Sequence, residues 1–438
     1  MRNFMVIWVG QVLSLLGTAV SNFGLTIWAY EASGGQATPL TTVGFFFVLP
    51  MVIFSPIAGV LVDRFNRKVM MMLSDFAAAL TTLIILVLHT LGKLEIWHLY
   101  VTAFIGGTFQ GFHFPAYSAA ITTMLDKKHY ARAHSMLGIA DSAAGVVAPT
   151  LAGALIGPLG LRGLLIIDLV TAVFAITILF FARIPQPQRT ETGRQARGNI
   201  LQESGYGFRY IFARPSLLGL QTVFLCANFF FSLAFAVIAP LILGRTHNNE
   251  LMFGSIQSAF AIGGLVGGVV MSIWGGPKRR IYGLIFGLAL TGIPLCLMGA
   301  GQSLPVWIGA AFLLTLLIPM LNSSSQAIWQ SKVPPDVQGR VFAARSLIAQ
   351  LVAPFARLIS GPLADRVFEP AMQESGVLAP IAGKIVGVGP GAGIGLMYVL
   401  AGICAVIIPL IGYTLPFIRN VESLIPDHDA ATANVEKE

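Results

Sequence analysis

Charged residues are scarce in this sequence. Only 11% of its 438 residues are Asp, Glu, Lys or Arg, whereas 55% are hydrophobic. Soluble domains carry about 25% charged residues, so a mostly water-exposed surface is excluded and most of the chain is predicted to face lipid. The net charge of +8 does not indicate a nucleic-acid partner, because the bases are scattered between apolar runs and form no single basic face.

Cysteine motifs and nucleotide-binding loops are also missing. The cysteines Cys226, Cys296 and Cys404 lie far apart inside apolar runs, which excludes a disulfide framework and a C-x-x-C zinc site. No G-x-x-x-x-G-K-S/T loop is present, so ATP hydrolysis by the P-loop route is excluded. The seven histidines have no metal-like spacing. We therefore expect no metal, no cofactor and no enzymatic activity.

Long apolar runs are abundant instead. A helix needs about 20 apolar residues to cross the hydrocarbon core of a bilayer, and twelve runs meet that length. The first run follows Met1 and Arg2 and is too long for the apolar part of a cleaved signal peptide, so it is predicted to remain as a span. The sequence thus predicts an all-α integral membrane protein with twelve transmembrane helices. The predicted spans are residues 5–30, 40–62, 69–91, 96–124, 133–157, 162–182, 216–244, 253–275, 281–300, 304–329, 341–362 and 393–417.

Lysine and arginine residues gather in alternate loops. With twelve spans, the loops and ends on one side hold 20 of these residues and the loops on the other side hold 5. Cytoplasmic loops are enriched in Lys and Arg. The richer side, which includes both termini, is therefore predicted to be cytoplasmic, and the chain is expected to be a multi-pass protein of the inner (plasma) membrane.

A polar segment after the sixth run separates two groups of six runs. The two groups show a weak repeat, because residues 132–153 and 340–361 both begin with Arg, end with Gly and contain an Ala-Pro pair. Transporters built from such repeats bind their substrate where the repeats meet. The predicted units are a first bundle of residues 1–183, a cytoplasmic linker of residues 184–215, a second bundle of residues 216–418 and a cytoplasmic tail of residues 419–438.

The segment GVLVDRFNRK, residues 59–68, ends the second run with an acid and three bases. It resembles the signature loop of the major facilitator superfamily of secondary transporters. Asn66 replaces a glycine of that signature, and since asparagine tolerates a left-handed backbone, we expect the tight turn to be kept. The resemblance implies two six-helix bundles and a latch on the cytoplasmic side; the alternative is that the bases only set the topology. The residues of this gate motif are Gly59, Asp63, Arg64, Arg67 and Lys68.

A second segment, GPLADRVFEP at residues 361–370, is similar in sequence to the gate motif. It follows the eleventh run, so the charge distribution places it on the outer side, opposite the gate motif. We interpret it as a loop that ends a helix and has no gating role.

Across nearly all of its length the chain is similar to the branch of this family that includes macrolide efflux proteins and the enterobactin exporter. Residues 145–153, GVVAPTLAG, are a loose form of the exporter pattern, and Gly107 stands where many proton-driven members have arginine. The resemblance implies a monomeric secondary active transporter that exports small amphipathic organic molecules by alternating access, coupled to protons or sodium. An uptake carrier or uniporter with the same fold is the alternative, and a membrane enzyme or sensor is a third.

Charged residues inside the runs each need a partner or a purpose, because burial in lipid is costly. Asp141 is a candidate for proton coupling or substrate contact, or else a structural carboxylate. Arg357 is either a partner of Asp141, a contact for the anionic part of a substrate, or half of a fixed ion pair. Arg345 is assigned to the inner gate, and Asp75 and Asp168 are interpreted as structural.

Polar uncharged residues also fall inside the predicted spans. Several lie on the first, fourth, seventh and tenth spans, which line the cavity in the family that the chain resembles. They suit an amphipathic small-molecule substrate, although hydrogen bonding between helices would also explain them. These cavity candidates are Asn22, Gln110, Asn228, Asn322 and Gln326.

Overall fold

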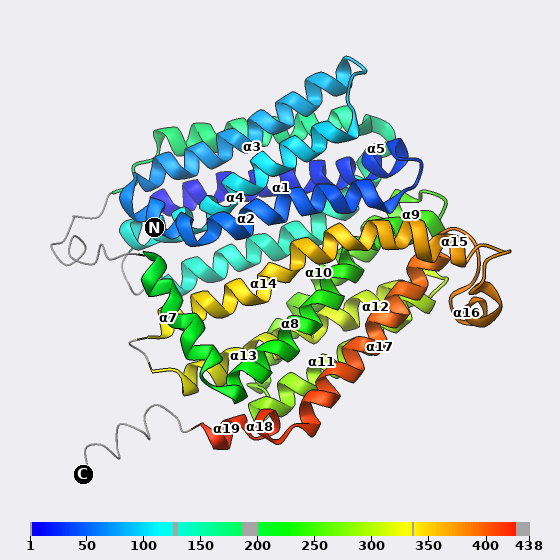
Figure 1. Cartoon of the computed structure of the whole chain (residues 1–438). Coiled ribbons are helices and arrows are strands. Elements are labelled where there is room, and N and C mark those ends of the chain that lie inside the picture. Colours follow the sequence, from blue (N-terminus) through cyan, green and yellow to red (C-terminus); the bar gives the residue numbers. More distant parts are fainter. Residues whose placement is uncertain (1, 126–129, 186–199, 335–336, 426–438) are drawn as a thin grey trace, which may run out of the picture.

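The computed structural model of the chain describes residues 2–125, 130–185, 200–334 and 337–425, and the side chains of residues 55–64 lie outside the described part (Figure 1). Every regular element in these ranges is a helix. The first half contains α1 Arg2–Ala32, α2 Ala37–Arg64, α3 Arg67–Thr90, α4 Ile96–Met124 and α5 Tyr130–Phe181. The second half contains α7 Ile200–Phe212, α8 Pro215–Ala236, α9 Ile238–Arg245, α10 Glu250–Trp274, α11 Arg280–Ala300, α12 Leu304–Leu316, α13 Ile318–Lys332, α14 Gln338–Leu363, the π-helical turn η2 Ala364–Phe368, α15 Glu369–Ala371, α16 Ala379–Val386, α17 Ala392–Thr414, α18 Pro416–Arg419 and α19 Val421–Leu424.

Ten helical stretches among the described residues are long and apolar enough to cross a membrane. One of them, Met136–Phe181 in α5, has 46 residues and turns at Gly160, where φ is 62° and ψ is 179°. The chain reverses there, because Met136 and Ile178 both contact the first turns of α1, through Trp8 and Gly10 respectively. The all-helical membrane fold is confirmed; the count of twelve spans and the cytoplasmic placement of the termini stay predictions.

Two of the predicted runs form two helices each rather than one. The break between α8 and α9 falls at Val237, and the break between α12 and α13 falls at Leu317. Pro240 and Pro319 follow these points, and a proline ring removes one backbone donor and clashes with the preceding turn. The chain therefore changes direction inside these spans without leaving the membrane-spanning stretch.

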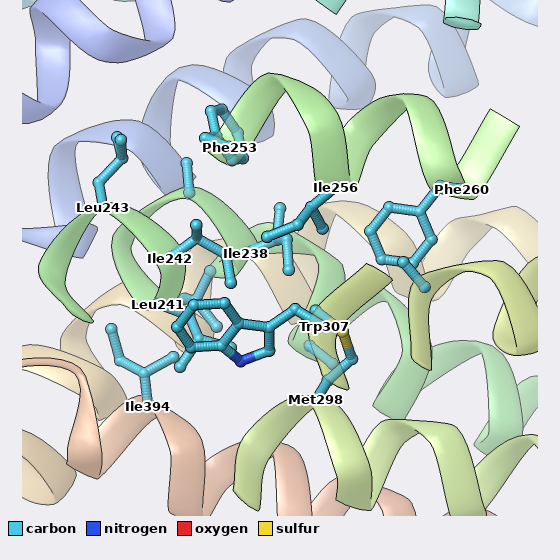
Figure 2. Close-up of a cluster of buried hydrophobic side chains, with 14 of the residues drawn as sticks. Ile238, Leu241, Ile242, Leu243, Phe253, Ile256, Phe260, Met298, Trp307 and Ile394 are labelled. Atoms are coloured by element: carbon cyan, nitrogen blue, oxygen red, sulfur yellow. The ribbon is translucent and has the colours of Figure 1, made fainter. Parts of the chain in front are cut away.

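The molecule has two ends, which we call the terminal end and the far end. The terminal end holds the start of α1 and α19, and the far end holds α9, α15 and α16 (Figure 1). At the far end one buried cluster combines side chains of both halves, including Phe23, Ile27 and Ala37 with Leu241, Phe253 and Trp307. Figure 2 shows the second-half part of this cluster.

The cores at the terminal end are separate. One cluster contains first-half residues alone, such as Phe4, Met71 and Ile121. Another cluster contains only residues of the second half, such as Ile211 and Trp329. The two halves thus share a hydrophobic core at the far end and have a core each at the terminal end.

The segment of residues 361–370 is not the loop that its sequence suggested. It forms the end of α14, the π-helical turn η2 and the start of α15, and the Glu369 amide bonds to the Ala364 carbonyl across the wide turn. Helical geometry thus continues past Pro362, first in α14 and then in the wider turn η2. The linker segment also holds a helix, α7, which packs beside α14.

Glycines 263 and 267 let α10 lie directly on α12, as the pair spacing in GGLVGG indicates. A Cβ added at Gly267 would lie 2.2 Å from the Leu316 carbonyl oxygen, whereas one added at Gly268 would meet no atom within 4 Å. We therefore expect Gly267→Ala to destabilise the protein by about 1–3 kcal/mol through overpacking. Gly268→Ala is the matched control and is expected to leave thermal unfolding in detergent unchanged. Equal melting temperatures for the two variants would contradict the packing described.

Candidate functional site

The most extensive contacts between the bundles are two helix pairs that meet toward the far end. In the first pair, α5 lies along α10. Ser258 on α10 donates to the Val146 carbonyl at 2.5 Å, and its hydroxyl lies 2.7 Å from that of Thr150. The rings of Phe23 and Phe253 stack at 5.0 Å between the halves. These contacts close the far end with both apolar and polar groups.

In the second pair, α2 lies along α14. Arg357, one of the predicted site residues, reaches from α14 to α2, where its guanidinium lies against Gly44. Its Nε is buried and has no hydrogen-bond partner among the described residues. An arginine held between bundles with an unused donor can bind an anionic or carbonyl group of a ligand.

Asp141 is exposed on α5, and no hydrogen bond or ion pair joins it to another described residue. The predicted alternative in which it pairs with Arg357 is therefore not the arrangement in this conformation. A carboxylate within a membrane-spanning stretch that has no protein partner is free to exchange a proton or contact a ligand.

Among the described residues, four of the five polar candidates make no hydrogen bond between their side chain and another helix, and Gln326 is the exception. Asn22, Gln110 and Asn322 are exposed, and Asn228 is half-buried beside the phenylalanines 229–231. Asn22 points away from the α1 face that packs on the second half of α5, because Gly10, Gly17 and Gly24 form that face and a helix turns about 100° per residue. These four side chains remain candidates for contact with a ligand.

Gln326 takes part in a hydrogen bond between helices, the alternative left open for the polar candidates. Its Oε1 accepts a hydrogen bond from Nη1 of Arg345 at 2.9 Å, and Nη2 of Arg345 donates to Ser325 at 2.8 Å. The guanidinium also lies over the Trp329 ring at 5.2 Å. Arg345 is thus held within the second bundle, and Gln326 is one of the groups that hold it, because a buried guanidinium requires several acceptors.

The gate motif is described only in part. The side chains of Gly59, Asp63 and Arg64 lie outside the described residues. Lys68 donates to the carbonyls of Phe180 and Ala182 at 2.6 and 2.9 Å, so it binds the end of α5. Arg67 begins α3 beside it.

Asn66 does not adopt the left-handed backbone expected for it. Its φ is −65° and its ψ is 119°, and its side chain accepts from the Lys68 amide at 3.0 Å. Asparagine is among the preferred N-cap residues because its side-chain oxygen satisfies a free amide of the first helical turn. The replacement of glycine therefore starts α3 through a cap rather than through a left-handed turn.

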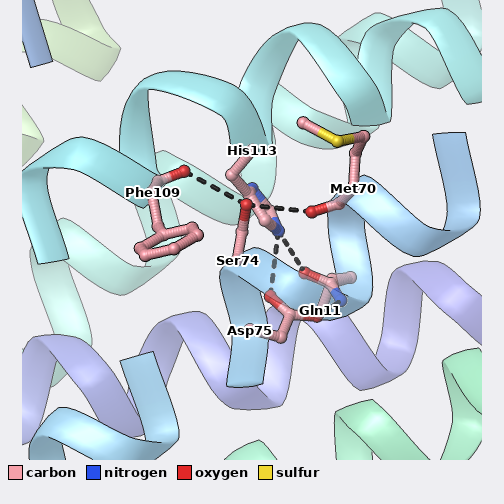
Figure 3. A network of polar contacts seen from close by, with 6 residues as sticks. All are labelled: Gln11, Met70, Ser74, Asp75, Phe109 and His113. Atoms are coloured by element: carbon pink, nitrogen blue, oxygen red, sulfur yellow. Dashed lines mark hydrogen bonds and ion pairs between the residues drawn. The ribbon is translucent and has the colours of Figure 1, made fainter. Parts of the chain in front are cut away.

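A buried polar network in the first bundle was not predicted as a unit (Figure 3). Nε2 of His113 on α4 lies 3.1 Å from a carboxylate oxygen of Asp75 on α3 and 3.1 Å from Oε1 of Gln11 on α1. Nε2 of Gln11 donates to the other Asp75 oxygen at 2.8 Å. Gln11 lies 64 residues before Asp75 and 102 residues before His113, so their positions along the chain do not indicate that the three side chains meet. The only local signal was an acid and a histidine that each needed a partner in the membrane.

Asp168 is a second buried acid of the same bundle whose side chain is held by hydrogen bonds. Its carboxylate accepts hydrogen bonds from Thr18 and Ser21 on α1 and from Thr82 on α3, at 2.8 to 2.9 Å. Both buried acids thus tie neighbouring helices together, in agreement with their interpretation as structural groups.

Two helical bundles of membrane-spanning stretches that meet at one end, with Arg357 held between them, are the arrangement of a membrane transport protein. The chain belongs to the Major Facilitator Superfamily, whose family model matches residues 7–357. It is a non-enzymatic transporter of that family.

Relatives with efflux names cover most of the chain. Macrolide efflux protein A of Streptococcus pyogenes is 26% identical over 368 residues, 83% of this chain and 90% of that protein. Multidrug efflux pump Tap of Mycolicibacterium fortuitum is 25% identical over 365 residues, 80% of this chain and 87% of that protein.

Solved structures with a similar fold include a bacterial homologue of the lysosomal transporter Spinster and a bacterial homologue of the iron transporter ferroportin. The first has a TM-score of 0.66 at 14% identity and covers 95% of this chain and 96% of its own. The second has a TM-score of 0.65 at 14% identity and covers 94% and 99%. At this identity the likeness concerns the fold.

Proposed function

We propose that the chain exports small amphipathic organic molecules across the inner (plasma) membrane by alternating access, driven by exchange with protons. The observation that carries the proposal is the shared core at the far end beside separate cores at the terminal end. A transporter that rocks two bundles about a central site is built in this way. The efflux names of relatives that cover most of the chain support export as the direction.

Two charged residues are proposed to work during this cycle. Asp141, which makes no hydrogen bond or ion pair with any described residue, would bind and release the coupling proton, and sodium is the alternative coupling ion. Arg357 would contact an electronegative group of the substrate with its unused Nε donor. The exposed Asn22, Gln110 and Asn322, with Asn228, would contact its other polar groups.

The gate motif is proposed to close the terminal end in the opposite conformation. Asp63 ends α2 on the side where the cores are separate, and an acid there can bind the positive end of a helix from the other bundle. The lipid bilayer and the small-molecule substrate are the partners expected, and the transporter is proposed to act as a monomer.

Transport by inside-out vesicles tests this proposal. Vesicles that contain the protein, loaded with an acidic interior, are expected to accumulate a radiolabelled macrolide, and addition of a protonophore should release it. Vesicles without the protein are the control. Accumulation that resists the protonophore but needs a sodium gradient would support sodium as the coupling ion, and uptake that only equilibrates the substrate would support a uniporter. Absence of accumulation for macrolides and cationic dyes under every gradient would overturn the export proposal.

A further inference from the structure

Asp365, at the far end of the second bundle, caps the first turn of α2 in the first bundle. Its two carboxylate oxygens accept hydrogen bonds from the backbone amides of Ala37 and Thr38, at 2.9 and 2.7 Å. The Thr38 hydroxyl donates to the same group at 2.5 Å. The amides that begin a helix have no acceptor within it, and the helix dipole attracts an acid to that end. One side chain thus makes three hydrogen bonds from one bundle to the other.

The backbone around Asp365 is shaped for this contact. Asp365 lies in η2, the π-helical turn that follows α14. A Cβ added to Gly361, one turn earlier, would lie 2.5 Å from the Cα of Thr38 and 2.2 Å from the hydroxyl oxygen of Thr41. The glycine therefore lets the end of α14 approach α2 closely enough for the carboxylate to reach the helix start.

The pattern G-x-L-x-D-R ends both helices of this antiparallel pair. It occurs as residues 59–64 at the end of α2 and as residues 361–366 at the end of α14. The direction of the two helices follows from the contacts, since Thr41 faces Gly361 and Gly44 faces Arg357. The two copies of the pattern consequently stand at opposite ends of the molecule.

We propose that Asp365 is a gate residue of the transport cycle, which holds the far end closed in this conformation and releases α2 when the bundles separate there. The inference rests on the alternating access proposed above and adds a second gate to it. It replaces the interpretation of residues 361–370 as a segment without a gating role. Asp365 is a positioning residue, because it acts on the relative placement of α2 and α14. It contributes only in the state in which the far end is closed, so its removal shifts the balance between the two states.

The chain offers a matched control in Glu369, one turn after Asp365. Its carboxylate also accepts hydrogen bonds from amides at the start of a helix, those of Gly391 and Ile394 beside α17, at 3.1 and 2.9 Å. Both partners belong to the second bundle. Loss of Glu369 therefore removes the same kind of bond without removing a hydrogen bond between the described parts of the two bundles.

The test measures the distance between spin labels at the far end, in protein reconstituted into nanodiscs without substrate. The labels replace the exposed Gln36 and Gln373, one on each bundle, with Cys226, Cys296 and Cys404 changed to serine. Asp365→Asn is expected to raise the population with the longer distance about tenfold relative to the unsubstituted protein, because charge-assisted hydrogen bonds are lost in the closed state only. Asp365→Glu should restore part of the closed population, and Glu369→Gln should leave the distribution unchanged.

An unchanged distribution in Asp365→Asn would overturn the gate, and so would an equal shift in Glu369→Gln. If Asp365→Asn does not fold, Thr38→Val takes its place: it removes one of the three bonds, and a smaller shift in the same direction is then required. The measurement needs no transported molecule. A far-end shift without vesicle transport would leave the gate standing and remove the export proposal, and transport without the shift would do the reverse.

Discussion

Asp141→Asn should abolish proton-driven transport while leaving folded protein in the membrane. Asparagine has nearly the same shape as aspartate but cannot bind and release a proton at neutral pH. Asp141 makes no hydrogen bond or ion pair with any described residue, so the substitution breaks no such contact that holds the fold. In inside-out vesicles, accumulation driven by a proton gradient is expected to fall to the level of vesicles without the protein.

Exchange of labelled for unlabelled substrate without a gradient provides the control for Asp141. This exchange needs the two conformations but no net proton movement, so Asp141→Asn should retain it. Asp168→Asn is the comparison substitution, because Asp168 is buried and bonded to Thr18, Ser21 and Thr82. It is expected to lower stability rather than coupling. Gradient-driven accumulation at the unsubstituted rate in Asp141→Asn would remove the assignment of the coupling site.

Gly254→Leu should stop transport by preventing closure of the far end. A Cβ at Gly254 on α10 would lie 2.5 Å from the Pro149 carbonyl oxygen and 3.5 Å from the Phe23 ring, both in the first bundle. A leucine side chain cannot fit between the bundles, so the closed far end is lost. Vesicle transport should then be undetectable, and a cysteine introduced at Gln36 should react faster with an impermeant thiol reagent applied from the far side.

The matched substitution on the same helix is Gly268→Leu. An added Cβ there meets no atom within 4 Å, so this variant is expected to keep its transport rate. If both glycine variants transport normally, α5 and α10 do not need the contact at Gly254. If both fail, the loss reflects the helix itself and not the approach of the bundles.

Apolar run length predicted the helices well because a membrane span has a fixed minimum length. The breaks at Val237 and Leu317 were missed, although Pro240 and Pro319 marked them. The length of an apolar run reports on hydrophobicity and contains no information about the direction of the helix axis.

Contacts between distant residues could not be read from the sequence. The grouping of Gln11, Asp75 and His113 depends on how three helices pack, and so does the attachment of Gln326 to Arg345. Two predictions from local sequence patterns were wrong. Asn66 was expected to permit a left-handed turn and instead caps α3, and residues 361–370 were expected to form a loop and instead form helical turns.

Alternating access is the central claim, and distances at both ends of the same molecule test it most directly. One spin-label pair at Gln36 and Gln373 reports on the far end, and a second pair at the exposed Phe65 and Lys278 reports on the terminal end. On addition of substrate and a change of pH, the account predicts that the far-end distance lengthens while the terminal-end distance shortens. Distances that change in the same direction at both ends, or that stay fixed under conditions that support transport, would contradict it.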